Sequence, residues 1–463
     1  MSSFPTLTPA LEHIHVDSDE KTDAEIEKQI IQTYRPVRHE RNCWTFWHSG
    51  FENMPRWCKR NIISWIRRLG PTWDVRCLDM VDGSPNNASR FVDARYLPDC
   101  LVNGSMTGKA AAVHASDMIR LPLVYLHGGV WADSGMVLLQ NFDDSFWNLL
   151  EDPKCPYEAF FFHFPHRPHE GQVLNGFIAA RKGNPFIERW MRVFYEIWKD
   201  RVDCDGLRYH PLIRHLGLID VTNGNKLGMT ASSGDTARHL IVDYLAQNWC
   251  FERVRLLVDV TEGWDGPAYY RKHICFLDAR REYWKYAALM PTSLQVKLMS
   301  LPFKPELTRE SAMEEDPEGY IPGSAELADT PESEIDEPRL QQLARDWLTN
   351  IASSCVAVKF SGGYWWPGSG WPMPLAVTWV LPDHEDDDVK PGTWAEWFRY
   401  ASTHMRQTRK VPVYGTWCPE GVNQSSVPEV LRAETERVLY AGLLEPARES
   451  DGWEFIPPFE TAL

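Results

Sequence analysis

Several features that would narrow the function are missing from this sequence. It has no run of about eighteen consecutive apolar residues, the length that a membrane-spanning helix requires, so we expect no membrane span. Its 10 cysteines include no CxxC pair, which argues against a zinc module. The first stretch, MSSFPTLTPALEHIHVDSDEKTD, has neither a basic start nor an apolar core. We therefore expect no secretory leader, and a cytoplasmic protein with free thiols.

A surplus of positive charge is also missing. The formal net charge is -16, which makes the chain a poor general binder of nucleic acid or of anionic membranes. Much of the acidity is local, because residues 305–338 contain twelve Asp or Glu residues and one Arg, a net charge of −11. This segment combines its acidity with Pro, Gly and Ser and lacks periodicity, so we expect a disordered linker or loop there.

The rest of the chain has the composition of a folded protein. Apolar residues make up 43% and charged residues 24% of its 463 residues, which suits a large core or two domains of ordinary size. Residues 1–40 are polar and predict a tail or docking arm. We expect the folded core over residues 41–304 and, after the acidic segment, a C-terminal region over residues 339–463 that completes a cleft.

The first half of the core alternates between strand and helix patterns. Arg41–Ser49 and Trp73–Leu78 are rich in β-forming residues, and Pro55–Leu69 between them has apolar residues at helical spacing. This β–α–β order is typical of a parallel sheet. Glu158–Phe164 and Leu174–Ala180 predict two further strands. The predicted fold class is therefore α/β, with a mostly parallel Rossmann-type sheet flanked by helices and an additional C-terminal segment.

The rest of the chain is organised around residues 114–138, HASDMIRLPLVYLHGGVWADSGMVL. Ala110–Ala112 favour a helix at the start of this stretch, and we expect Thr107 to cap it. Asp117 and Arg120 are three residues apart, so they share one face of that helix and can lie side by side.

A short strand and an acidic turn follow the helix. Gly128-Gly129 can end the helix with a left-handed residue, and Val130–Ala132 then predicts a short buried strand. Asp133 stands where the strand ends, which is where α/β sheets gather their ligands. A carboxylate followed by Ser134 and Gly135 can hold a hard cation or a sugar hydroxyl with little steric obstruction.

The order of these residues resembles a known family. The pattern Ser116-Asp117-x-x-Arg120, then Tyr125, Gly128-Gly129 and Trp131-x-Asp133, resembles the DXD-containing sugar-binding region of family 32 glycosyltransferases and their fungal capsular polysaccharide synthesis-like relatives. The resemblance extends over residues 41–260 and implies a GT-A-like core. In that family the acidic turn holds a Mn²⁺–nucleotide sugar. Here the second Asp of the motif is Gly135, so we expect Asp133 to bind Mn²⁺ or Mg²⁺ less tightly.

The resemblance also implies roles for single residues. The expected catalytic residues are Asp117, Arg120 and Asp133, of which Asp133 is the metal ligand. The expected donor-binding residues are Trp47, Trp44, Ser134, Gly135 and Asn175. Either tryptophan could stack on the base, with Trp47 the better match, and each could instead be a core residue. Asn175 could bond a sugar hydroxyl or cap a turn.

Two further stretches leave their role open. His163, His166 and His169 are spaced by three, as in a metal site, but the prolines between them interrupt a helix. A loop at the rim of the cleft is the alternative. In the C-terminal region, either the aromatic loop 361–372 or the HEDDD run at 384–388 could complete the site. The acidic run could instead be a solvated turn.

These features predict a soluble glycosyltransferase of natural product biosynthesis. As the resemblance implies, it would move a hexose from a UDP- or GDP-linked sugar to a hydroxyl of a small molecule or glycan, with retention. The expected partners are these two substrates, without nucleic acid. One alternative is a repurposed GT-A-fold protein that only binds a sugar or nucleotide, or that catalyses a metal-independent small-molecule reaction. Another is an interaction protein that docks through residues 305–338.

Overall fold

The computed structural model describes residues 4–17, 20–108, 110–163, 173–214, 216, 243–283, 292–306, 335–360 and 373–413. The predictions for His166, His169, the aromatic loop 361–372 and most of the acidic segment lie outside the described residues. Among the helices that fall within these ranges, none is long and apolar enough to cross a membrane.

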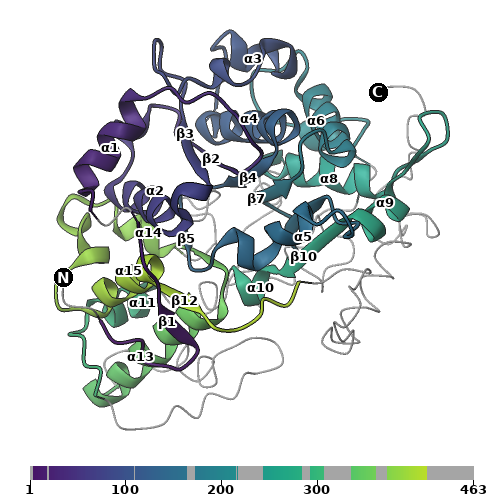
Figure 1. Ribbon diagram of the computed structural model, residues 1–463. Coiled ribbons are helices and arrows are strands. Elements are labelled where there is room, and N and C mark those ends of the chain that lie inside the picture. Colours follow the sequence, from purple (N-terminus) through teal and green to yellow (C-terminus); the bar gives the residue numbers. More distant parts are fainter. Residues whose placement is uncertain are drawn as a thin grey trace.

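A six-stranded sheet forms the centre of the molecule (Figure 1). Its strand order is β10-β6-β7-β4-β2-β3. The strands are β2 (Asn42–Phe46), β3 (Asp74–Leu78), β4 (Gly129–Ala132), β6 (Ala159–His163), β7 (Val173–Ala180) and β10 (Ile274–Asp278). β2 pairs in parallel with β3 and β4, and β6 pairs in parallel with β10, whereas β7 is antiparallel to both β4 and β6. Because only β7 runs against the others, the prediction of a mostly parallel α/β sheet is confirmed.

Two layers of helices cover the sheet, one on each face. Alternate residues of a strand point to opposite faces, so each strand contributes apolar side chains to both layers. On β2, Trp44 and Phe46 join one apolar cluster and Cys43 joins the other. The cluster that holds Trp44 is covered by α3 (Asp99–Val102), α4 (Ala111–His127), α6 (Pro185–Trp198), α8 (Ala246–Leu256) and α9 (Gly266–His273). The opposite cluster is covered by α1 (Asp23–Gln32), α2 (Arg56–Leu69), α5 (Asn148–Glu151), α10 (Ala279–Glu282), α11 (Thr292–Ser300), α13 (Glu337–Ser354), α14 (Leu375–Thr378) and α15 (Trp394–His404).

The helix and strand of the central stretch form as predicted, apart from the cap. α4 begins after Ala110, and the backbone N–H of Thr107 instead donates to the carbonyl of Val202, so the prediction that Thr107 caps the helix is wrong. Gly128 follows the helix with φ 70°. At Gly129, with φ 103°, an added Cβ would stand 2.3 Å from the carbonyl oxygen of Asn42. These two glycines therefore let β4 begin directly against β2.

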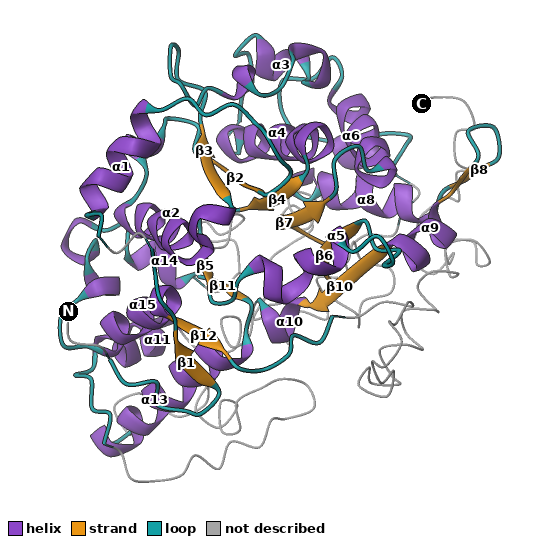
Figure 2. Ribbon diagram, in the orientation of Figure 1, coloured by secondary structure: helices purple, strands orange, loops and turns teal. Residues whose placement is uncertain are grey.

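The described part of residues 1–40 packs against the rest of the molecule, as the docking arm of the prediction would and a free tail would not. β1 (Leu11–His13) pairs antiparallel with β12 (Met405–Gln407), and both are visible together in Figure 2. Helix α1 buries Ile26 and Ile30 in the cluster that α2 also covers. The sequence hides this packing because only two residues of the helix are buried.

The C-terminal region reaches the central stretch through a short two-stranded sheet. β11 (Ala357–Lys359) pairs antiparallel with β5 (Met136–Leu138), the strand that follows the acidic turn. The register places Lys359 opposite Met136. The remaining two-stranded sheet joins β8 (Val258–Asp259) and β9 (Trp264–Asp265). The pairing of β11 with β5 brings a strand from the far end of the sequence to the edge where Asp133 lies.

Candidate active site

The three predicted catalytic residues converge at the carboxyl end of β4. Arg120 Nη2 lies 2.8 Å from Asp117 Oδ1 and 3.6 Å from Asp133 Oδ1. Helix α4 places Asp117 and Arg120 one turn apart, and Asp133 follows the last residue of β4. One guanidinium therefore links the helix to the acidic turn.

Asp117 is a buried residue whose two carboxylate oxygens are both engaged within the protein. Oδ1 accepts a hydrogen bond from Asn175 Nδ2 at 3.2 Å in addition to its ion pair with Arg120, and Oδ2 lies 3.1 Å from His114 Nδ1. Its backbone carbonyl accepts from Gln247 Nε2 at 2.7 Å. Asp117 is thus placed to orient Arg120.

Asn175 and Arg120 hold each other across the site. The Asn175 amide donates to Asp117 and also to Gln247 Oε1 at 3.0 Å, while its backbone carbonyl accepts from Arg120 Nη1 at 2.6 Å. The Arg120 guanidinium lies 5.1 Å from the centre of the Trp131 ring, a cation–π contact. The Asn175 side chain therefore belongs to the internal network that orients Asp117.

Asp133 has a partner that sequence reasoning missed. Lys359 Nζ lies 2.7 Å from Asp133 Oδ2, and Trp131 Nε1 donates to Oδ1 at 3.0 Å. Burial would raise the pKa of the Asp133 carboxyl, but Lys359 and Arg120 outweigh it and hold that pKa below its ordinary value. Lys359 stands 226 positions from Asp133, so only a lysine at the end of the apolar strand VAVKF signals it.

A series of hydrogen bonds between buried polar side chains holds the backbone of the acidic turn. The carbonyl of Ser134 accepts from Asn61 Nδ2 at 2.8 Å, and Asn61 Oδ1 accepts from Arg399 Nη1 at 2.5 Å. Arg399 Nε in turn donates at 2.8 Å to Asp388, which is fully buried. The interpretation of the HEDDD run as a solvated turn is therefore wrong for Asp388, which also pairs with Arg60 on α2.

The two tryptophans proposed to stack on the base lie in different surroundings. Trp44 is fully buried, and its indole N–H donates to the Gly128 carbonyl at 3.0 Å. Its ring packs against Phe91 and His127, so it is a core residue of β2. Trp47 is half-buried just beyond the carboxyl end of the same strand. Of the two tryptophans, only Trp47 is partly exposed, and it packs against the apolar cluster that holds Cys43.

Comparison with known proteins decides the family. Residues 12–227 match the family described as "Capsular polysaccharide synthesis protein". The O-glycosyltransferase braB of Annulohypoxylon truncatum is 36% identical over 96% of this chain and 96% of braB. Glycosyltransferase afumC of Aspergillus fumigatus is 36% identical over 89% of this chain and 97% of afumC. O-glycosyltransferase PaGT of Phomopsis amygdali is 34% identical over 87% of this chain and 91% of PaGT.

This chain belongs to their family of glycosyltransferases. The enzyme class and the family resemblance predicted from the motif are thereby confirmed. Among solved structures, one titled PaToxG Glycosyltransferase overlaps 38% of this chain and 67% of its own, with 14% identity. The TM-score of that overlap is 0.26, which supports no argument about the site.

The donor set around Asp133 of this glycosyltransferase does not fit a divalent cation. Position 135 is glycine, so the second carboxylate of a DXD pair is missing. Among the described residues, no group of three His, Cys, Asp or Glu side chains could hold a metal ion. Both oxygens of Asp133 already have partners, because Oδ2 contacts the Lys359 ammonium and Oδ1 accepts from Trp131 Nε1.

His163 is a buried histidine rather than an open metal ligand. It is the last residue of β6, and its ring lies 4.9 Å from the ring of Phe276. Burial, together with the positive charge of Arg255, lowers the pKa of His163 to about 3, so the ring is neutral at neutral pH. The other two histidines of the motif lie outside the described residues.

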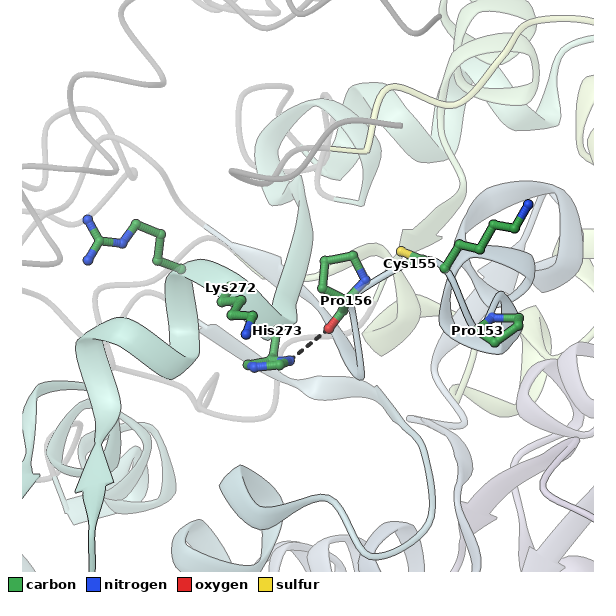
Figure 3. Close-up of a pocket in the computed structure, with 7 residues that line it drawn as sticks. Pro153, Cys155, Pro156, Lys272 and His273 are labelled. Carbon is green, nitrogen blue, oxygen red and sulfur yellow. Dashed lines mark hydrogen bonds between the residues drawn. The ribbon is translucent and has the colours of Figure 1, made fainter. Parts of the chain in front are cut away.

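Figure 3 shows a surface cavity of the glycosyltransferase. It has a volume of about 570 Å³ and is lined by Pro153, Lys154, Cys155, Pro156, Arg271, Lys272 and His273. These residues precede β6 and β10, and His273 Nδ1 donates to the Pro156 carbonyl at 2.8 Å. Because β4 runs in the same direction as β6 and β10, the cavity stands at the amino edge of the sheet and Asp133 at the carboxyl edge.

Proposed function

We propose that this glycosyltransferase moves a hexose from a UDP- or GDP-linked sugar to a hydroxyl of a small molecule or glycan, with retention at the anomeric carbon. The observation that carries the proposal is the partly exposed Asp133–Lys359 ion pair at the carboxyl end of β4, held by the buried Asp117 and Arg120. Ligands of α/β sheets bind at this edge. Two of the relatives are named O-glycosyltransferases, which supports a hydroxyl as the acceptor.

The roles of the residues follow from their exposure. Asp117 and Arg120 are positioning residues, because burial keeps them from a substrate while their contacts orient Asp133. Asp133 would accept hydrogen bonds from hydroxyls of the donor sugar. Trp47, at the end of the neighbouring strand β2, would stack on the base, since every base offers a π-face.

The place of action proposed for this enzyme is the cytoplasm, and the proposed process is natural product biosynthesis. The nine cysteines of the described part are all free thiols, and this fits a reducing compartment.

A donor panel tests the proposed function. UDP-, GDP- and TDP-hexoses are added to the purified full chain, and the melting temperature and hexose transfer are measured. We expect one donor class to raise the melting temperature and to support transfer. Asp133→Asn should lower kcat/KM by about a hundredfold, since it removes a charge that orients the donor. Asp386→Asn, which changes an exposed carboxylate of the HEDDD run, is the matched control.

The contrary outcome is equally definite. If Asp133→Asn and Asp117→Asn both transferred hexose at the wild-type rate, the carboxyl edge of β4 would not be the active site. If no nucleotide sugar raised the melting temperature or was turned over, the donor class would be wrong.

A further inference from the structure

We propose that this enzyme uses no divalent cation at its acidic turn, and that the Lys359 ammonium supplies the positive charge that binds the donor diphosphate. The inference rests on the proposed function and concerns the same site. Two features of the acidic turn support it. Position 135 is glycine where a DXD motif has its second carboxylate, and Lys359 from a distant strand forms an ion pair with the first one, Asp133.

The charges around Asp133 disfavour a further cation. Lys359 Nζ is 2.7 Å from Oδ2 and Arg120 Nη2 is 3.6 Å from Oδ1, so one carboxylate already faces two positive groups. Trp131 Nε1 occupies Oδ1 as well. A divalent ion that bound Asp133 would meet the Lys359 ammonium and the Arg120 guanidinium at close range, and the second carboxylate of the site, Asp117, is already paired with Arg120 and His114.

The backbone holds the Lys359 ammonium in this position. β11 pairs with β5 in a register that puts Lys359 opposite Met136, next to the acidic turn. Its backbone N–H also donates to the Tyr283 carbonyl at 3.2 Å. Space for the pair comes from Gly176 on β7, where an added Cβ would stand 2.6 Å from Asp133 Oδ2 and 3.3 Å from Lys359 Nζ. Three strands therefore position the ion pair: β4 precedes Asp133, β11 carries Lys359, and β7 leaves space for both.

The chemistry required of the ammonium is electrostatic. During transfer the bond between the anomeric carbon and the diphosphate oxygen breaks, and its electron pair stays on that oxygen. The anomeric carbon forms a new bond to the acceptor oxygen, whose proton leaves to the released diphosphate. Lys359 keeps its protons throughout. One N–H holds Asp133 while the others can donate to phosphate oxygens, and this favours the negative charge that grows on the leaving group.

Nucleotide binding without metal tests the inference. The full chain is treated with EDTA and titrated with UDP and with GDP by calorimetry, in EDTA and in excess Mn²⁺. We expect the better nucleotide to bind with an affinity that differs by no more than about threefold between the two buffers. Lys359→Ala should weaken that binding by about tenfold or more, because a charged hydrogen-bond donor to phosphate is lost. Lys359→Arg should retain most of it.

The matched control removes the positive charge of a different lysine, one that lies on the surface. Lys304 forms an exposed ion pair with Glu337 at 2.8 Å, so Lys304→Ala should leave nucleotide binding unchanged. Transfer by the wild-type enzyme should persist in EDTA. Should Lys359→Ala fail to fold, Lys359→Arg and the wild-type comparison in the two buffers still decide the matter.

Two results would overturn the inference in distinguishable ways. Binding of UDP or GDP that disappears in EDTA and is unchanged in Lys359→Ala would show a metal-dependent enzyme and leave the proposed function intact. Failure of UDP, GDP and their sugars to bind in either buffer would remove the proposed function together with this inference.

Discussion

The charge of the His114 side chain depends on its contact with Asp117 in the candidate site. It lies on α4 one turn before Asp117, and its Nδ1 is 3.1 Å from the Asp117 carboxylate. Burial opposes a charged imidazole, but the contacts with Asp117 and Cys204 outweigh it and raise the pKa of His114 to about 9. At neutral pH, Asp117 therefore lies between two cations, His114 and Arg120.

The raised pKa of His114 predicts how stability changes with pH. A group whose pKa is higher in the folded state contributes stability that is complete below its ordinary pKa of 6.5 and lost as pH rises through about 9. The loss should reach at most about 3 kcal/mol of unfolding free energy. Urea unfolding from pH 6 to pH 10 measures it. His114→Gln should flatten this fall, whereas His15→Gln, at an exposed histidine, should keep it.

At the scale of elements, the close approach of β7 to the end of β4 shapes the site. The backbone N–H of Asp133 donates to the Gly176 carbonyl at 2.9 Å, and the Asp133 carboxylate then lies where a side chain at position 176 would begin. A glycine in the middle of a strand ordinarily weakens it. Here the glycine leaves room for the side chains of Asp133 and Lys359, which a larger residue at position 176 would displace.

Gly176→Ala tests this reading of β7. The new methyl group should displace the Asp133 carboxylate and lower kcat/KM by about tenfold or more, while overpacking costs about 1–3 kcal/mol of stability. Ala179→Gly on the same strand is the control, because it weakens the strand by about 1 kcal/mol without touching the ion pair. Activity assays and thermal unfolding of both variants separate the two effects. Wild-type activity in Gly176→Ala would contradict the role given to this glycine.

For the whole molecule, the important feature is how residues 4–16 are joined to the C-terminal region. β1 pairs with β12, and the indole N–H of Trp397 on α15 donates to the Pro5 carbonyl at 3.0 Å. On the other side of α15, Arg399 bridges Asp388 and Asn61 of α2. The C-terminal region that supplies Lys359 is thus packed into the same body as the sheet.

Truncation from the N-terminus tests this integration. Deleting residues 1–16 removes β1 and the buried Leu11 and Val16, and should lower the melting temperature by about 5 °C or more. Deleting residues 1–3 alone removes none of the contacts described here and should have no such effect. Differential scanning calorimetry compares the two. If the variant that lacks residues 1–16 melted at the same temperature as the full-length protein, residues 1–40 would be a tail after all.

Much of the fold could be predicted because its signals are local. The apolar spacing of α2, the short strands β2 and β3, and the helix–glycine–strand order that ends at Asp133 all lie within neighbouring residues. The same continuity made the family recognisable from one stretch of sequence. The pairing of β1 with β12 was missed because nothing near residues 11–13 indicates a partner almost four hundred positions away.

Local patterning was sufficient to establish the α/β class, the glycosyltransferase family and the meeting of Asp117 with Arg120, since spacing along one helix fixes which side chains share a face. Only the tertiary structure showed that the Asn175 amide donates to Asp117 and that Lys359 pairs with Asp133. The physical reason is that charge compensation in a buried site depends on distance in space, and the compensating group here comes from a strand 226 positions away.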